Sequence, residues 1–221
     1  GFFDLSIASG RPHIAGPVSA SALGCPQGAL ARPGGVIDLT LGEALDRWNG
    51  RAALRADAVR AQGVVMARPD LKVEFDGHGQ NMTANARLTG QAFRGGGVLA
   101  EGVALDSRWS MGKGMEGQGA LTARNVRMAS ADPLASLRES TAATPVGPLM
   151  QRLAQAVCDA GRDNGLRGRF ALAQRGAGGS IVIDEAALSA RSGAQVRLAP
   201  GSRMQINWPG PAGAPADWAL N

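Results

Sequence analysis

A seven-residue phrase occurs three times in this chain at almost constant spacing. The copies are LRADAVR at 54–60, LTGQAFR at 88–94 and LTARNVR at 121–127. The similarity extends past the phrase, because at an offset of about 34 residues Phe75 aligns with Trp109. Periods of about 20 to 50 residues are typical of stacked arrays, in which each unit needs its neighbours to bury its apolar face. The repeat therefore predicts an elongated protein that is built by adding similar units.

Apolar and polar residues alternate through much of the chain. Residues 71–76, for example, place leucine, valine and phenylalanine between lysine, glutamate and aspartate. A strict period of two puts the apolar side chains on one face of a half-buried strand. With 44% hydrophobic residues, only 4% aromatic residues and 32 glycines, the 221-residue chain favours short strands joined by tight turns.

Three Asn-Gly or Asp-Gly dipeptides, at 49–50, 76–77 and 164–165, are typical of hairpin turns because these residues tolerate positive φ angles. We therefore predict antiparallel hairpins that turn at these positions. The predicted fold class is mainly β, with repeated antiparallel hairpins forming an elongated curved sheet or β-groove.

One interval departs from the strand pattern. Asp132-Pro133 is typical of a helix start, and the apolar residues at 149–160 follow helical spacing. A short helix is also predicted at 41–48. The expected organisation is a β-repeat segment at 1–131, a helical insertion at 132–161, a continuation of the β-repeat segment at 162–208, and a linker or frayed tail at 209–221.

The net charge of +5 and the pI of 10.5 raise the question of nucleic-acid binding. All of the 23 basic residues except Lys72 and Lys113 are arginines, and they are dispersed rather than clustered. Aromatic residues for base stacking are few, and no nucleic-acid recognition motif is present. We expect solvated arginines on the polar faces of strands and no nucleic-acid partner.

The two cysteines, Cys25 and Cys158, leave two alternatives open. They could form one disulfide in an oxidising compartment. Alternatively, Cys158 could be a buried free thiol, because it lies in an apolar stretch with helical spacing.

The sequence contains no catalytic constellation. His13 and His78 are isolated from any cysteine or acidic cluster at metal-ligand spacing. The glycines at 112–114 lack the other residues of a phosphate-binding loop. Asp184 and Glu185 are adjacent, so on a strand they would point to opposite faces. We therefore expect no enzyme activity, no metal and no cofactor.

The apolar face of the predicted sheet needs a cover, because large exposed apolar strips are rarely left bare. Only one substantial helical segment is predicted, so a groove occupied by acyl chains competes with a closed sandwich whose inner faces cover one another. The candidate groove-lining residues are the apolar members of the alternating strands, which a closed core would use equally. They are Leu71, Val73, Phe75, Met82, Leu88, Leu105, Trp109, Met111, Ile181, Ile183, Val196, Leu198, Met204 and Ile206.

The repeated unit has a characteristic order of sequence motifs. The dipeptide at 50–51 leads into the first copy of the phrase, GVV follows it, and a long alternating strand ends in Phe-Asp-Gly at 75–77. This unit resembles the hairpin repeats of the AsmA-like superfamily, which includes the TamB and YdbH proteins, and within it the YdbH-like branch. The resemblance covers the repeats at 50–128, the segment TPVGPLMQRLAQA at 144–156 and the strands that resume at Leu166.

The resemblance implies a protein of the Gram-negative cell envelope, anchored in the inner membrane by an N-terminal helix. Its periplasmic part would form a long hydrophobic β-groove that moves phospholipid or similar lipids between the inner and outer membranes. Its partners would be lipid acyl chains and, through other parts of the chain, components of both membranes. This chain begins at Gly1 without Met and has no run of about 18 apolar residues, so we expect a portion of such a protein without its anchor. The alternative is a structural or adhesive secreted β-repeat protein with a closed core and no ligand.

Overall fold

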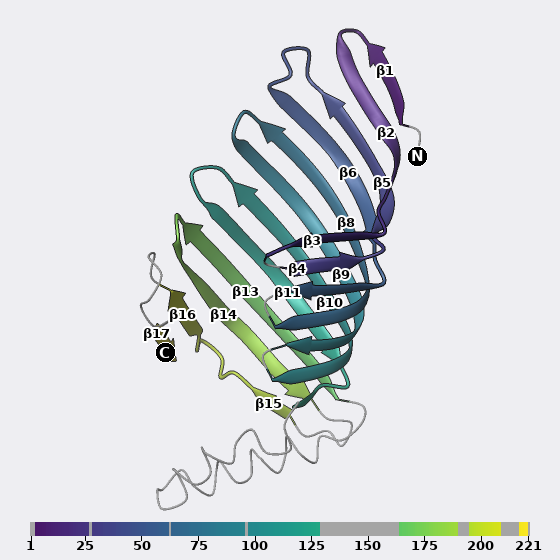
Figure 1. Cartoon of the computed structure of the whole chain (residues 1–221). Helices are drawn as coiled ribbons and strands as arrows, with labels where there is room; N and C mark the ends of the chain where they lie inside the picture. The colour runs from purple at the N-terminus through teal and green to yellow at the C-terminus, as the bar shows by residue number, and fades with distance from the viewer. Residues whose placement is uncertain are drawn as a thin grey trace, which may run out of the picture.

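The computed structural model describes residues 3–26, 28–61, 63–95, 97–128, 164–189, 195–208 and 217–220. In this part of the chain all regular elements are strands, and they form one 17-stranded antiparallel sheet. The sheet is bent across its strands into two facing walls, with the shorter strands lying in front of the longer ones (Figure 1). The prediction of a mainly β, open and curved antiparallel sheet is confirmed. The predicted helical insertion at 132–161 lies outside the described residues.

We call the larger of the two walls the long wall. Its strands, in spatial order, are β1 (Asp4–Ala8), β2 (Arg11–Ser19), β5 (Gly34–Leu41), β6 (Arg47–Arg55), β8 (Val64–His78), β9 (Asn81–Gly95), β10 (Val98–Met111), β11 (Met115–Arg124), β13 (Gly165–Arg175), β14 (Gly178–Ser189), β16 (Met204–Trp208) and β17 (Asp217–Leu220). A short strand, β15 (Gln195–Arg197), pairs with the end of β14.

We call the smaller wall the short wall. Its strands, in spatial order, are β3 (Ala22–Cys25), β4 (Gly28–Ala31), β7 (Ala58–Ala61), the beginning of β8, the end of β9, the beginning of β10, and β12 (Arg127–Met128). Because β8, β9 and β10 run through both walls, these three strands join the walls into one continuous sheet.

The walls meet along a line at which strand after strand is interrupted or bulged. In β8 the pairing register with β9 shifts between Ala67 and Asp70. Backbone hydrogen bonds continue across the line, as from the Arg68 N–H to the Asp57 carbonyl at 2.8 Å. Bulges of this kind bend a strand and raise its local twist. Four non-glycine residues with positive φ lie on the line: Arg32 (45°), Arg68 (46°), Ala92 (47°) and Asn125 (53°).

The predicted turns and the short predicted helix are wrong. Residues 49–50 lie inside β6, residues 76–77 lie inside β8, and residues 164–165 immediately precede and begin β13. The interval 41–48 contains the end of β5, a turn and the start of β6 rather than a helix. The glycines of the first two dipeptides are explained by the space that a neighbouring aromatic ring occupies, not by a positive φ angle. A Cβ built on Gly50 would lie 3.0 Å from the Phe75 ring, and one on Gly77 would overlap the Trp48 ring.

The register explains the repeat of about 34 residues. Five leucines lie in one row across β6, β8, β9, β10 and β11, each paired directly with the next. Their spacing of about 17 residues is half the repeat, so each repeat unit is one hairpin of two long strands. We call this set the leucine row, which comprises Leu54, Leu71, Leu88, Leu105 and Leu121.

Candidate functional site

One face of the long wall is apolar from strand to strand. Directly paired residues of an antiparallel sheet share a face, so the register defines rows of side chains. Two further rows lie on the face of the leucine row, and none of the three rows contains a charged side chain. One passes through Ile14, Leu39, Gly50, Phe75, Ala84, Trp109, Gly117, Leu172, Ile181 and Ile206. The other passes through Ile37, Ala52, Val73, Ala86, Ser107, Gly119, Phe170, Ile183 and Met204.

This apolar face looks towards the short wall. At the bend, side chains from both walls line a hollow of about 520 Å³ whose lining atoms are almost all apolar. Leu30 and Met66 contribute from the short wall, and Leu54 and Leu88 contribute from the long wall. We call the facing surfaces of the two walls the inner face, and the space between them the groove.

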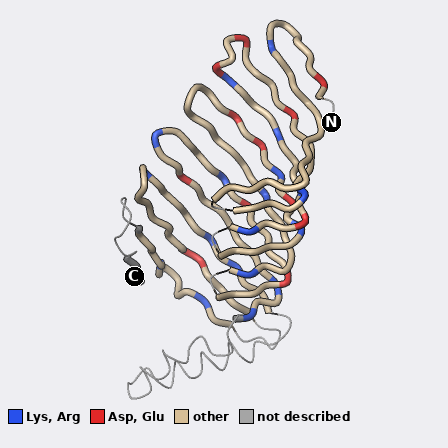
Figure 2. Tube along the Cα trace, viewed as in Figure 1, with Lys and Arg blue, Asp and Glu red and all other residues tan. Residues whose placement is uncertain are grey.

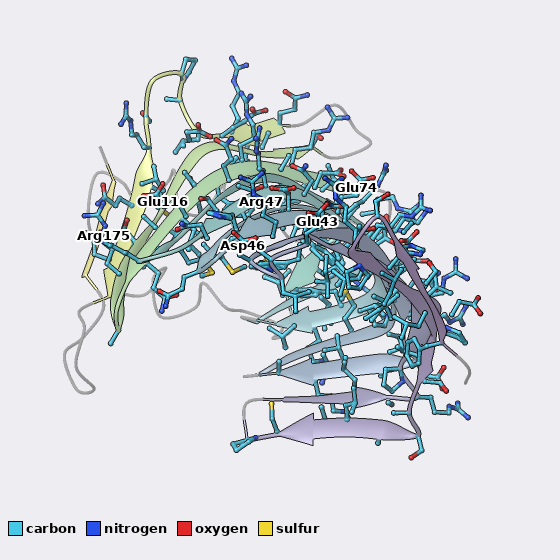
Figure 3. All side chains as sticks on the ribbon, turned by 90° about the horizontal axis from the view of Figure 1, so that it is seen from above. Glu43, Asp46, Arg47, Glu74, Glu116 and Arg175 are labelled. Carbon is cyan, nitrogen blue, oxygen red and sulfur yellow. The ribbon has the colours of Figure 1, made fainter. Side chains whose placement is uncertain are left out.

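The groove is open along its length, and its apolar side chains are only partly covered. In the described part of the chain the buried apolar residues are Met66, Ala84, Ala100 and Ala123, and no large side chain is fully buried. Figure 3 shows mostly carbon atoms between the two walls, whereas nitrogen and oxygen atoms gather on the outer side of the bend. Covering apolar surface contributes about 25 cal/mol per Å². The inner face can therefore hold an apolar occupant that the protein itself does not supply in its described part.

Aromatic rings make part of the inner face smooth. The Trp109 ring lies over Gly117 on the neighbouring strand, where any Cβ would overlap the ring. The one hydroxyl of the central rows is satisfied within the sheet, because Ser107 Oγ accepts from Trp109 Nε1 at 2.9 Å and donates to the Ala86 carbonyl at 3.3 Å. The inner face thus offers apolar contact without a free polar group at this point.

The outer face of the long wall carries the charges. Cross-strand ion pairs recur along it, and their side chains are largely exposed, so each pair adds little stability. Their role in the architecture is to keep this face in water. The pairs are Arg51–Asp38 (2.9 Å), Arg55–Asp70 (2.8 Å), Arg87–Asp106 (3.5 Å) and Arg169–Glu185 (2.6 Å).

Asp38 on this face has two side-chain partners, a histidine and an arginine. His13 Nε2 lies 2.8 Å from its Oδ1, and Arg51 Nη2 donates to its Oδ2 at 2.9 Å. The hydrogen bond with His13, followed by that with Arg51, lowers the pKa of Asp38 below its ordinary value. The cluster is a charge network of the outer face.

A larger hollow of about 1120 Å³ lies on the outer face of the long wall. A twisted sheet is saddle-shaped, so each of its faces is concave in one direction. The hollow is lined by the ion-paired residues Asp38, Arg51, Arg87 and Asp106 among others. Other charged residues, including Lys72, Glu74 and Arg108, also line it, so this hollow is polar where the groove is apolar.

The structure brings nearly all of the sequence-predicted residues onto the inner face. Leu198 lies just beyond β15, where its N–H donates to the Ala186 carbonyl at 2.8 Å. The others occupy inner rows by register: Leu71, Leu88 and Leu105 in the leucine row; Val73, Ile183 and Met204 in the row of Ser107; Phe75, Trp109, Ile181 and Ile206 in the row of Trp109; Met82 paired with Met111; and Val196 in the row of Ala123 and Leu166.

Sequence reasoning missed the contribution of the short wall and of the first strands. It also missed Leu54 and Leu121 of the long wall, which the spacing of about 17 residues could have added to the leucine row. No comparable spacing identifies the residues that face it across the bend. The missed inner-face residues include Val18, Leu23, Leu30, Ile37, Val59 and Met66.

The cysteine and histidine side chains that could carry chemistry lie apart from one another in the described part of the chain. Cys25 is exposed at the end of β3, and Cys158 lies outside the described residues. His78 Nε2 lies 3.0 Å from Asp46 Oδ2 at the hairpin ends. Among the described residues, no three His, Cys, Asp or Glu side chains are grouped so as to hold a metal ion. The same part of the chain includes no helix with the length and hydropathy of a membrane span.

No family model matches this chain, and neither a curated protein nor a solved structure matches it.

Proposed function

We propose that this chain is a segment of a lipid-transfer bridge, which carries phospholipid or a similar lipid between the inner and outer membranes of a bacterial envelope. The observation that carries the proposal is the open groove, whose inner rows run from strand to strand without a charged side chain. Such a surface fits acyl chains, while the charged outer face fits the aqueous space between two membranes. The proposal needs no catalytic residue.

The energetics of an acyl chain suit this role. Each buried CH₂ contributes about 0.8 kcal/mol, so ten buried methylenes contribute about 8 kcal/mol before the cost of ordering the lipid. The rows repeat from strand to strand with similar side chains, as in the leucine row. Neighbouring positions along the groove therefore bind an acyl chain about equally well, which lets the lipid move along the sheet. Aromatic rings that lie over glycines, such as Trp109 over Gly117, leave no projecting side chain that would obstruct the moving lipid.

The resemblance to the AsmA-like superfamily supports the same assignment. Under this proposal the groove works in the periplasm, as part of a longer protein that contacts both membranes. The lipid headgroup remains in water at the open side of the groove. Lipid acyl chains are the ligand, and membrane components are the partners at the two ends of the bridge.

The direct test is the lipid content of the purified protein. The protein is isolated without detergent, and native mass spectrometry and solvent extraction measure the bound phospholipid. We expect at least one phospholipid per chain. If carefully purified, folded protein carries no lipid and takes none from phospholipid vesicles, the transfer proposal is refuted and the closed structural or adhesive alternative is favoured.

Two neighbouring positions of β10 provide a matched pair of variants. Leu105 belongs to the inner leucine row, whereas Ala104 lies on the outer face, paired with Thr89 and Thr122. We expect Leu105→Arg to lower lipid occupancy strongly and Ala104→Arg to leave it unchanged, although both add one positive charge. Equal effects of the two substitutions would show that lipid does not follow the inner face.

A further inference from the structure

The last residue of each copy of the repeated phrase is an arginine, and the groove does not account for it. Register places Arg60, Arg94 and Arg127 in one row of the short wall, with Val65 and Leu99 between them. We call these three residues the arginine row. They lie on alternate strands, so neighbouring arginines are about 10 Å apart. All three are exposed.

Among the described residues, no member of the arginine row has an acidic partner, whereas several arginines of the long wall do. Register sets Arg87 opposite Asp106 and Arg169 opposite Glu185, although Arg108 and Arg167 on the same wall lie opposite uncharged residues. Within the described part of the chain, no carboxylate forms an ion pair with any member of the arginine row. The acidic residues of the adjoining segments are engaged elsewhere, because Asp57 pairs with Arg32 and Glu101 accepts from Asn125.

The surroundings of the arginine row are small and apolar. The row continues through Ala29 and Gly24 on β4 and β3. The next row on the same face is also free of acidic residues, and it adds one more exposed arginine. That row passes through Ala22, Ala31, Ala58, Ala67, Gln91, Gly102 and Arg124. Val65, between two arginines, is 36% exposed. Figure 2 shows basic positions recurring from strand to strand on the short wall.

We propose that the outer face of the short wall docks on an anionic lipid bilayer. A sheet face of alanine, glycine, valine and leucine can lie against the headgroup layer, and arginines at a spacing of about 10 Å can each meet the phosphate of a different lipid. Arginine forms bidentate, charge-assisted hydrogen bonds with phosphate. Both rows carry arginines and no acidic residue, so their positive charge complements an anionic surface. The apolar residues between the arginines favour a bilayer over an acidic protein.

This inference does not require the groove to carry lipid. Docking uses the opposite side of the short wall, whose outer residues do not line the groove. Lipid carried in the groove and docking on a bilayer are therefore separable by mutation. A variant of the arginine row leaves the inner face intact, and a variant of the leucine row leaves the docking face intact.

The test is partition of the protein onto vesicles. Sedimentation with phosphatidylcholine vesicles containing phosphatidylglycerol is compared for wild type and the triple variant Arg60→Gln, Arg94→Gln, Arg127→Gln. Each basic residue near an anionic surface contributes enough that loss of three lowers the partition coefficient about 100-fold. Raising the salt concentration to about 0.5 M weakens wild-type binding, because it shortens the Debye length to a few ångströms.

The matched control removes the same charge from the long wall. The variant Arg51→Gln, Arg87→Gln, Arg169→Gln has the same net charge as the test variant, and we expect it to bind within about threefold of wild type. Lysine at the three positions of the arginine row restores most of the binding, and circular dichroism verifies that every variant is folded.

Four results would overturn the proposal. They are equal loss of binding in the two glutamine variants, equal binding of wild type to neutral and anionic vesicles, no vesicle binding by wild type, and selective binding of an acidic polypeptide such as polyglutamate in place of vesicles. The first would assign binding to net charge alone, and the last would assign the row to an acidic protein partner.

Discussion

Substituting an arginine for Leu105 distinguishes an open groove from a closed core by stability alone. Full burial of a leucine side chain contributes about 1.5–3 kcal/mol, and Leu105 is only half-buried in the middle of the leucine row. The arginine stem retains part of the apolar contact, and its guanidinium can reach water through the open side of the groove. We therefore expect Leu105→Arg to lower the free energy of unfolding by about 1 kcal/mol.

A closed core predicts a much larger effect for the same substitution. There the guanidinium would be buried without a partner, and the cost would exceed about 4 kcal/mol. The assay is urea unfolding of lipid-free protein, since bound lipid would add its own stabilisation to the wild type. With a slope of about 2 kcal/mol per M, the open groove predicts a midpoint shift of about 0.5 M and an unchanged slope.

The outer-face variant Ala104→Arg again serves as the control, and we expect it to shift the free energy of unfolding by less than about 0.5 kcal/mol. If Leu105→Arg fails to fold while Ala104→Arg is normal, the inner face is covered in solution and the open groove is refuted. That outcome is separate from the lipid measurement, because it is read without lipid.

Three further substitutions test the construction of the sheet. Gly117→Val places a side chain in the space of the Trp109 ring, so we expect a loss of about 1–3 kcal/mol in urea unfolding and a changed tryptophan fluorescence spectrum. Asn164→Leu removes the buried side-chain amide that accepts from the Val126 N–H and donates to the Val126 carbonyl, and we expect a loss of about 1–3 kcal/mol because both part-buried backbone groups lose this partner. The lowered pKa of Asp38 means that its stabilising effect is present above the pKa of the unfolded chain, near pH 4, and is lost as pH falls through the folded value. Thermal melting between pH 6 and 2.5 should therefore show a smaller acid-induced decrease for Asp38→Asn than for wild type. Each prediction is contradicted by a variant that matches wild type in its assay.

The apolar inner rows could be predicted because they depend on a period of two, which the sequence displays directly. Val73 and Phe75 alternate with charged residues whether the strand curves or not, so their common face follows from local geometry. The hairpin array could be predicted because each strand pairs mainly with its neighbours in the chain. The register then follows from the equal spacing of the leucines.

The bend could not be predicted from the usual signals, because it is made without glycine. Ala92 and Arg68 adopt positive φ angles that such residues rarely choose, so propensity argues against a bend where the structure has one. The glycines at 50 and 77 predicted turns where the structure has strands. Gly50 and Gly77 occupy strand interiors because rings from the neighbouring strands need their space. The one usable signal was the repeated Ala-Arg-Pro at 31–33 and 67–69, which crosses the bend twice.

The repeated phrase is the segment of each unit that crosses the bend. In the second copy, Leu88 lies on the inner face of the long wall, Ala92 has the positive φ angle, and Arg94 lies on the outer face of the short wall. The five residues 89–93 thus connect an apolar side chain that faces the groove to a cationic side chain that faces away from it. Copying the phrase at the interval of one hairpin extends the groove and the arginine row together, with the same step. If the groove carries lipid and the arginine row docks on a bilayer, as we propose, the length of the apolar path and the number of bilayer contacts are coupled. A longer array of these units then gains lipid capacity and free energy of membrane binding together.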